Sequence, residues 1–239
     1  MSVSDAFHVP LQNRLLAALP LDDYERLRPW LELVDLTTRQ VLYKPHESIT
    51  HVYFPRNCLV SLVTLMDDST AIEVATVGND GMVGLPVYLG TDRSADQAIC
   101  QVPGTAFRIE AAAFRAQLGA LSPLHRILQA YTLALLTLTS RTAACNRIHS
   151  MEQRCARWLL MTHDRVGADE FQLTQEFLAQ MLGVRRATVN GAAGVLQRAG
   201  WIRYRRGQVT VVDRDGLEGA CCGCYRVIAD EFARLLNPV

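Results

Sequence analysis

The sequence predicts an α+β chain with a β-rich N-terminal part, a long helix and a C-terminal winged helix-turn-helix domain. Short β-forming runs alternate with turn residues between about Thr37 and Arg108. Apolar residues then follow an unbroken helical period from Leu124 to His149. The stretch from Leu173 to Val212 has the spacing of two short helices followed by a hairpin.

Residues 11–33 predict a short helical segment, because apolar residues recur there every three to four positions. They are Leu15, Leu16, Leu19, Leu27, Trp30 and Leu31. The β-rich part follows as five runs, 41–43, 51–54, 59–63, 72–77 and 98–102. Turn signals separate them, at 44–46, 55–57, 66–69, 78–81 and 102–104. Short strands at this spacing predict an antiparallel sandwich or roll rather than a parallel sheet.

Ser122 and Pro123 suit the N-cap and first turn of the long helix. Its apolar seam has heptad spacing and comprises Leu124, Leu128, Tyr131, Leu135, Leu138, Thr142, Cys145 and His149. Such a narrow stripe sets one helix against another, so the seam predicts a parallel homodimer, with Ile127, Leu133 and Leu136 covering the β-domain. The alternative is a single core helix lying on the β-domain of its own chain.

A helix from Met151 to about Val166 leads into the helix-turn-helix. Counted from Gln175, the interior positions hold Leu178, Leu182, Val184, Val189 and Ala192. Ala179 falls where the two helices cross closely, and Gly183 falls at the tight turn that needs a positive φ. Thr174 is placed to cap the first helix. Seven matching positions make the motif specific.

The second helix, from about Arg185 to Arg198, is expected to enter the major groove of DNA by its N-terminal residues. Arg185, Arg186, Thr188 and Asn190 lie near its exposed start. Arginine can read guanine and asparagine can read adenine, while threonine supplies a phosphate or methyl contact. A solvated surface charge is the alternative for an isolated arginine. Two arginines beside the turn of a matched motif favour DNA contact.

Apolar or aromatic residues alternate with arginines from Ile202 to Arg205, and a second β-forming run follows from Val209 to Val212. Together the two runs predict a β-hairpin wing. Arg205 and Arg206 at its tip suit phosphate contact, and Thr174 and Gln175 complete the predicted DNA-binding set. A single final helix is expected from Arg214 to Leu236. The predicted domains are thus residues 1–122, a connector helix at 123–150, and residues 151–239.

Charge follows the same division, although the formal net charge is zero. Residues 1–150 hold 12 Lys+Arg against 14 Asp+Glu, whereas residues 151–239 hold 12 against 10. Within 173–212 the acidic residue is Glu176, and Asp213 lies just past the end. The arginines of this stretch are Arg185, Arg186, Arg198, Arg203, Arg205 and Arg206. This concentration of positive charge is typical of a phosphate-facing surface.

The first residues lack the pattern of a secretory signal, and no apolar run reaches the length of a membrane span. We therefore expect a cytoplasmic protein without a membrane partner.

The seven cysteines favour reduced thiols over a disulfide framework. Cys221, Cys222 and Cys224 suggest zinc, but a structural site needs four ligands and no second cluster is near in sequence. Small buried residues are the favoured interpretation, so no metal site is predicted.

The order of a β-rich domain, a long helix and a winged helix-turn-helix resembles the Crp/Fnr superfamily of bacterial regulators. The resemblance covers nearly the whole chain and is carried by MEQRCARWLL, LGVRRATVNGAAGVLQRAGWIRYRRG and NDGMVGLPVYLG. It implies a cyclic-nucleotide-binding-like β jelly roll, a homodimer on a palindromic DNA site, and contact with RNA polymerase. Family members that bind cAMP carry an acidic residue and an arginine where this chain has Ala187 and Gly191, so the preferred DNA sequence should differ.

The resemblance also implies a small-molecule effector, whose identity and cofactor, if any, the sequence leaves unknown. Cyclic-nucleotide binders use a Gly-Glu-x-x-Leu turn and a later Arg-Ser pair. This chain offers Gly84, Arg93 and Ser94, but Leu85 replaces the glutamate, which argues against ordinary cAMP recognition. The iron–sulfur route of the oxygen-sensing branch is not expected, because the first cysteine is Cys58.

The sequence thus predicts a homodimeric transcription regulator rather than an enzyme, since no G-x-S-x-G, P-loop, HExxH or paired-carboxylate pattern is present. Two alternatives stay open. One is a constitutive regulator whose β-domain is only a scaffold, and the other is a nucleotide-binding module with a winged helix that docks a protein.

Overall fold

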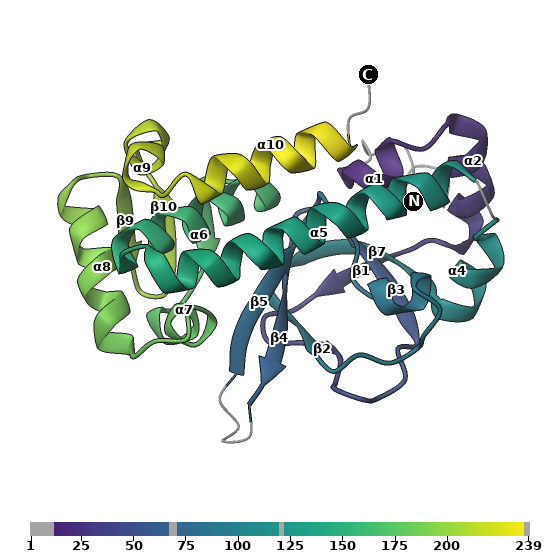
Figure 1. The fold of residues 1–239 in the computed structure, drawn as a ribbon, viewed down its shortest axis with the longest axis horizontal. Coiled ribbons are helices and arrows are strands. Elements are labelled where there is room, and N and C mark those ends of the chain that lie inside the picture. Colours follow the sequence, from purple (N-terminus) through teal and green to yellow (C-terminus); the bar gives the residue numbers. More distant parts are fainter. Residues whose placement is uncertain (1–11, 67–70, 120–121, 237–239) are drawn as a thin grey trace, which may run out of the picture.

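The computed structural model describes residues 12–66, 71–119 and 122–236. It confirms the predicted α+β class: an antiparallel β-domain, a long helix and a C-terminal domain with two short helices and a hairpin. The long helix α5 crosses the molecule, with the β-domain beneath one half of it and the C-terminal domain at its other end (Figure 1). Residues 67–69 of one predicted turn lie outside the described residues.

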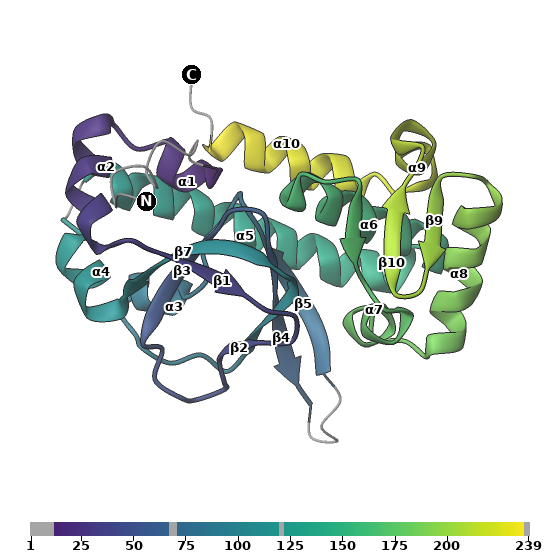
Figure 2. The ribbon, with the colours of Figure 1, turned by 180° about the vertical axis from the view of Figure 1, so that it is seen from behind.

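The β-domain consists of two antiparallel sheets. Their strands are β1 (Glu32–Leu36), β2 (Val41–Tyr43), β3 (His51–Pro55), β4 (Leu59–Leu65), β5 (Ala71–Val77), β6 (Gln97–Val102) and β7 (Gly104–Glu110). The first sheet has the order β1-β7-β3 (Figure 2). The second sheet has the order β2-β6-β4-β5. All five predicted runs are strands, and β1 and β7 are additional ones that pair with each other.

Short helices cover the ends of this domain. They are α1 (Arg14–Ala17), α2 (Leu21–Leu27), the 3-10 turn η2 (Arg28–Trp30), α3 (Leu85–Tyr88) and α4 (Ala111–Gln117). The predicted helical segment therefore ends at Trp30, because the chain from Glu32 onward pairs with β7. Phe54 and Phe114 are fully buried and lie at the centre of the core against each other.

The long helix α5 (Pro123–Ile148) begins at the predicted N-cap, where Ser122 Oγ accepts a hydrogen bond from the His125 N–H. Its seam, however, faces its own chain. Leu128 is 0% exposed and Leu138 is 1% exposed, and Leu124, Tyr131 and Cys145 are also buried. The seam residues Leu135 and Thr142 are half-buried. The prediction that the seam faces a partner is wrong, because the β-domain and the last helix of the same chain already cover it.

The solvent-facing side of α5 is the side that was expected to cover the β-domain. Leu133 is 48% exposed and Leu136 is 60% exposed, and Ser140, Ala143 and Arg147 continue the same stripe. At 100° per residue this stripe lies opposite the seam. Ile127 alone of the three predicted covering residues is half-buried.

Helix α6 (Met151–Val166) follows after a two-residue break and begins with a capping box between Ser150 and Gln153. Gly167 ends it in the left-handed conformation, with φ of 69°. The remaining elements are β8 (Glu170–Gln172), α7 (Gln175–Met181), α8 (Arg186–Arg198), β9 (Ile202–Arg205), β10 (Gln208–Val211), α9 (Arg214–Ala220) and α10 (Cys224–Leu236).

The final segment is two helices, not the single helix that the sequence predicted. Helix α9 ends where Cys221 takes an extended conformation, with φ of −79° and ψ of 165°. The second helix, α10, then runs back beside α5 (Figures 1 and 2). Its Ile228, Phe232 and Leu236 are buried, so the break lets an apolar face reach α5 and α6.

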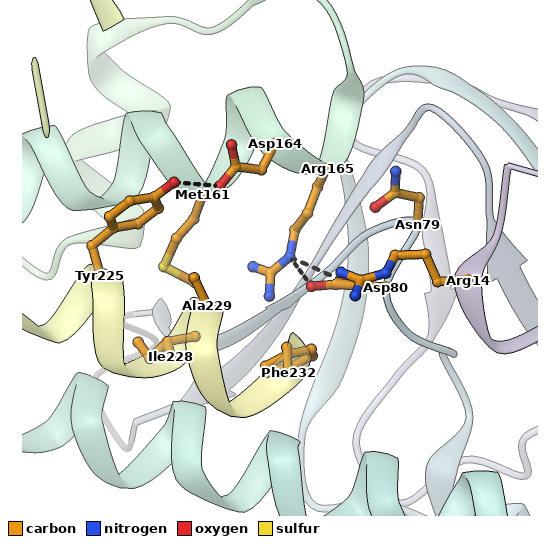
Figure 3. A pocket seen from close by; sticks show the side chains of 10 residues that line it. All are labelled: Arg14, Asn79, Asp80, Met161, Asp164, Arg165, Tyr225, Ile228, Ala229 and Phe232. Atoms are coloured by element: carbon orange, nitrogen blue, oxygen red, sulfur yellow. Dashed lines mark hydrogen bonds and ion pairs between the residues drawn. The ribbon is translucent and has the colours of Figure 1, made fainter. Parts of the chain in front are cut away.

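A buried ion pair joins the C-terminal domain to the β-domain. The Nε of Arg165 in α6 donates to both carboxylate oxygens of Asp80, at 3.0 Å each. The guanidinium also donates to Thr76 and lies 5.5 Å from the centre of the Phe232 ring. Figure 3 shows this pair at a small cavity of about 190 Å³ between α1, α6, α10 and the β5 turn. Gly78 is required beside it, because a Cβ there would lie 2.4 Å from the Arg165 side chain.

A second buried contact links the same two domains. The indole N–H of Trp158 in α6 donates to Glu73 of β5 at 2.8 Å, and Ser61 Oγ donates to the other carboxylate oxygen at 2.6 Å. Burial raises the pKa of Glu73 to about 7, against an ordinary value of 4.5.

Within the described residues, no helix is both long enough and apolar enough to cross a membrane.

We expect the Glu73 contact to make the fold sensitive to pH. Between about pH 4.5 and 7 the folded chain keeps the proton on Glu73 while the unfolded chain releases it, so stability falls as pH rises through this window. The pKa difference corresponds to a loss on the order of 3 kcal/mol. Urea unfolding at pH 5 and pH 7 should therefore show a smaller decline for Glu73→Gln than for the wild type. Glu110→Gln, at an exposed position, is the control, and equal declines in wild type and Glu73→Gln would contradict the account.

Candidate nucleic-acid interface

The two helices of the motif are held as the sequence predicted. Thr174 Oγ1 accepts a hydrogen bond from the Phe177 N–H and so caps α7. Gly183 has a φ of 63°, which permits the tight turn between α7 and α8. Of the predicted interior positions, Leu178, Leu182, Val189 and Ala192 are buried together with Ala179, and Val184 is half-buried.

Helix α8 presents its N-terminal half to solvent. Arg185 is the N-cap residue and makes no side-chain capping bond. Arg185, Arg186, Thr188 and Asn190 are all exposed, whereas Val189, Ala192, Ala193 and Leu196 turn inward. The small Ala192 and Ala193 allow close packing on α6. Gly191 is exposed, and a Cβ there would meet no atom within 4 Å.

The predicted hairpin is formed by β9 and β10, with β8 on the outer side of β10. Arg206 and Gly207 form its two-residue turn, with φ of 50° and 79°. Positive φ at both positions is the geometry of a type I′ turn. Arginine rarely adopts this conformation, so the hairpin holds the exposed Arg206 at its tip at some cost in backbone energy. Arg205 is exposed beside it.

The hairpin tip, α7 and α8 meet around one open hollow of about 500 Å³. Its lining includes Thr174, Gln175, Arg186 and Arg206, four of the eight predicted DNA-binding residues. The nearest acidic group is Glu176, whose carboxylate lies 3.9 Å from Arg186. Because both side chains are exposed, this pair contributes little and leaves Arg186 available to another anion.

Sequence reasoning missed the residues that fix the wing on the motif. The Tyr204 hydroxyl donates to the Leu173 carbonyl at 2.6 Å, and Gln197 of α8 accepts from the Tyr204 N–H at 2.8 Å. It also missed Arg39 of the β-domain, which lines a second cavity of about 310 Å³ together with Thr174 and Arg206. Only the fold brings Arg39 to the wing, so no local pattern pointed to it.

Two of the three predicted effector residues, Arg93 and Ser94, are hydrogen-bonded to the backbone of His46. Gly84 has a φ of 97° and begins α3. The Arg93 guanidinium donates to the His46 carbonyl at 3.0 Å, and Ser94 Oγ accepts from the Asp96 N–H at 3.0 Å. Nearby, Tyr131 of α5 fills the space against Gly81, where a Cβ would lie 2.7 Å from its hydroxyl oxygen. An effector role for Gly84, Arg93 and Ser94 stays a prediction.

Comparison with known proteins matches residues 153–220 to the Crp-like helix-turn-helix domain. The structure resembles FixK2 from Bradyrhizobium japonicum, with a TM-score of 0.67, 17% identity, and coverage of 80% of this chain and 98% of that one. It also resembles TTHB099, a CRP-family transcriptional regulator from Thermus thermophilus, with a TM-score of 0.64, 20% identity, and coverage of 78% and 95%. A search of curated sequences finds no match.

CLP of Xanthomonas campestris, described as a c-di-GMP responsive global regulator, is similar as well. Its TM-score is 0.61 at 19% identity, with coverage of 80% of this chain and 99% of that one. This chain therefore carries a Crp-like helix-turn-helix domain within the fold of Crp/Fnr-type regulators, and the predicted resemblance is confirmed at that level.

Substitution by alanine should change the unfolding free energy in opposite directions at Gly183 and Gly191. Gly183→Ala forces a left-handed conformation on a residue with a Cβ and should cost about 1 kcal/mol of unfolding free energy. Gly191→Ala, inside α8 and facing open space, should gain about 0.5–1 kcal/mol. Urea unfolding of the DNA-free protein measures both, and equal effects of the two substitutions would refute the turn geometry.

Proposed function

We propose that the protein is a sequence-specific DNA-binding transcription regulator of the Crp/Fnr type, acting as a homodimer. The observation that carries the proposal is the exposed surface formed by the start of α8 and the wing. Arg185, Arg186, Thr188 and Asn190 face solvent there, and Arg206 lines the same hollow as Arg186. Such a surface suits a helix in the major groove flanked by a wing on the phosphates.

The start of α8 adds a second attraction for phosphate. Because no side chain of the described residues caps it, the N–H groups of Arg186 and Ala187 remain available to an anion, and the helix dipole favours negative charge there. Arg185 and Arg186 supply full charges at the same place. The contacts of Arg205 and Arg206 would be with the backbone, whereas Asn190 and one of the α8 arginines are the candidates for base readout.

Two copies would associate through the exposed stripe of α5. Leu133 and Leu136 are its apolar members of large size, and the spacing Leu133, Leu136, Ser140, Ala143 and Arg147 is again that of a heptad seam. A parallel pair of α5 helices would place two α8 helices on one side of the assembly, as a palindromic site needs. The exposed stripe takes the place of the predicted seam as the dimer surface, because the seam is buried within its own chain.

The β-domain would act through α5, which contacts both halves of the chain. Arg93 and Ser94 are already hydrogen-bonded to His46 and Asp96, and Tyr131 fills the space at Gly81. Both observations support a domain that does not bind cAMP in the ordinary way. Contact with RNA polymerase follows from the Crp/Fnr resemblance and belongs to the same proposal.

The double substitution Arg185→Ala with Arg186→Ala tests DNA binding. Loss of two charged contacts should weaken binding of a selected palindromic duplex by about 10²–10³-fold, and should lower the slope of log affinity against log salt by about 1 for each lost phosphate contact. Fluorescence anisotropy at several salt concentrations measures both quantities.

The matched control is Arg198→Ala, an exposed arginine at the far end of the same helix. It should change affinity by less than about threefold, because it lies away from the groove-facing end. Unchanged binding by the double variant would overturn the proposed interface.

Leu133→Glu with Leu136→Glu tests the dimer. Four carboxylates brought together across the stripe would repel, so light scattering coupled to gel filtration should show a monomer where the wild type is a dimer. Leu89→Glu, at an exposed leucine of the β-domain, should remain dimeric. A dimer in the double variant would refute this use of the stripe.

A further inference from the structure

A compact group of soft ligands lies where the long helix ends. Cys145 lies in the last turn of α5, and His149 is the residue directly after that helix. Cys222 lies in the break between α9 and α10, and Cys224 is the first residue of α10. One ligand atom from each of these residues lies within 4.8 Å of all the others. The three cysteines are buried and His149 is half-buried, and they form a cluster of their own beside the main apolar core.

The distances within the group fit a single tetrahedral ion. The sulfur atoms of Cys145 and Cys222 are 3.5 Å apart, and Cys224 Sγ lies 3.8 Å from His149 Nδ1. A zinc–sulfur bond of about 2.3 Å in tetrahedral geometry gives ligand-to-ligand edges of about 3.8 Å. An iron–sulfur cluster places several atoms between its cysteines and needs a wider group. Thiolate and imidazole ligands also select zinc over magnesium or calcium.

The charge around the group suits a metal-bound thiolate site. Arg157 of α6 is 3% exposed, and no carboxylate of the described residues lies within ion-pair distance of its guanidinium. Its Nη1 donates to Thr142, one turn before Cys145, and its Nε finds no hydrogen-bond partner in the described part of the chain. Three thiolates and one Zn²⁺ carry a net charge of −1, which would offset this buried cation.

We propose that Cys145, His149, Cys222 and Cys224 form a structural zinc site of the Cys3His type, where the sequence predicted no metal. Sequence analysis found no second pair of ligands near Cys222 and Cys224. The fold brings Cys145 and His149 to them. The ion would fix the start of α10 to the last turn of α5, close to the junction of α5 and α6. Because binding occurs only in the folded chain, the metal would stabilise that arrangement.

The test measures zinc in the full-length protein, purified without oxygen in the presence of reductant and after incubation with zinc. Elemental analysis should find about one zinc per chain in the wild type, and less than about a tenth in Cys222→Ser and Cys224→Ser. Cys221→Ser is the matched control: this neighbouring cysteine is half-buried and outside the group, so the variant should keep its zinc.

Cobalt gives a second measurement that needs no variant. Co²⁺ in the wild type should produce the intense visible absorption of a tetrahedral thiolate site, and added zinc should abolish it. The proposal is overturned if the wild type holds no zinc and gives no such spectrum. Retention of zinc by Cys222→Ser, or a Cys145–Cys222 disulfide persisting in the reduced wild type, would overturn it as well.

Discussion

The buried pair of Arg165 and Asp80 is the contact on which the arrangement of the two domains depends. Removing two charges from water costs free energy, which is offset only when the geometry of the pair is good. Here one guanidinium nitrogen donates to both carboxylate oxygens, and the Phe232 ring lies against the cation. The pair fixes α6 to the turn after β5. Helix α8 packs on α6, and Arg154 of α6 donates to the Leu182 carbonyl at 2.6 Å, so the position of α8 depends on the same pair.

The same constraint decides which side of α5 remains free. With α6 held on the β-domain and α10 lying along α5, the seam is buried within one chain and the stripe around Leu133 and Leu136 faces solvent. The proposed dimer surface on α5 is therefore joined to the proposed DNA surface on α8 through α6. A signal that altered the β-domain would act by shifting how α5 and α6 meet at residues 148–151.

Local features of the chain could be predicted because their causes are local. Ser122 and Thr174 cap helices by their own side chains, and Gly183 supplies the positive φ that the turn requires. The seam was found but assigned to the wrong neighbour, since periodicity shows that a stripe is buried and not what buries it. Cys145 lies 77 residues from Cys222, and Arg39 reaches the wing only through the fold, so neither relation was visible in sequence.

The break at Cys221 was missed for a related reason: the residues on both sides of it have helical periodicity, and the packing of α10 against α5 is visible only in the fold.

Hydroxyl-radical footprinting on a selected site most directly tests whether two α8 helices read DNA together. A homodimer should give two protected regions of equal strength, about 10 base pairs apart on one face of the duplex. A single asymmetric protected region, or none at low salt, would contradict it.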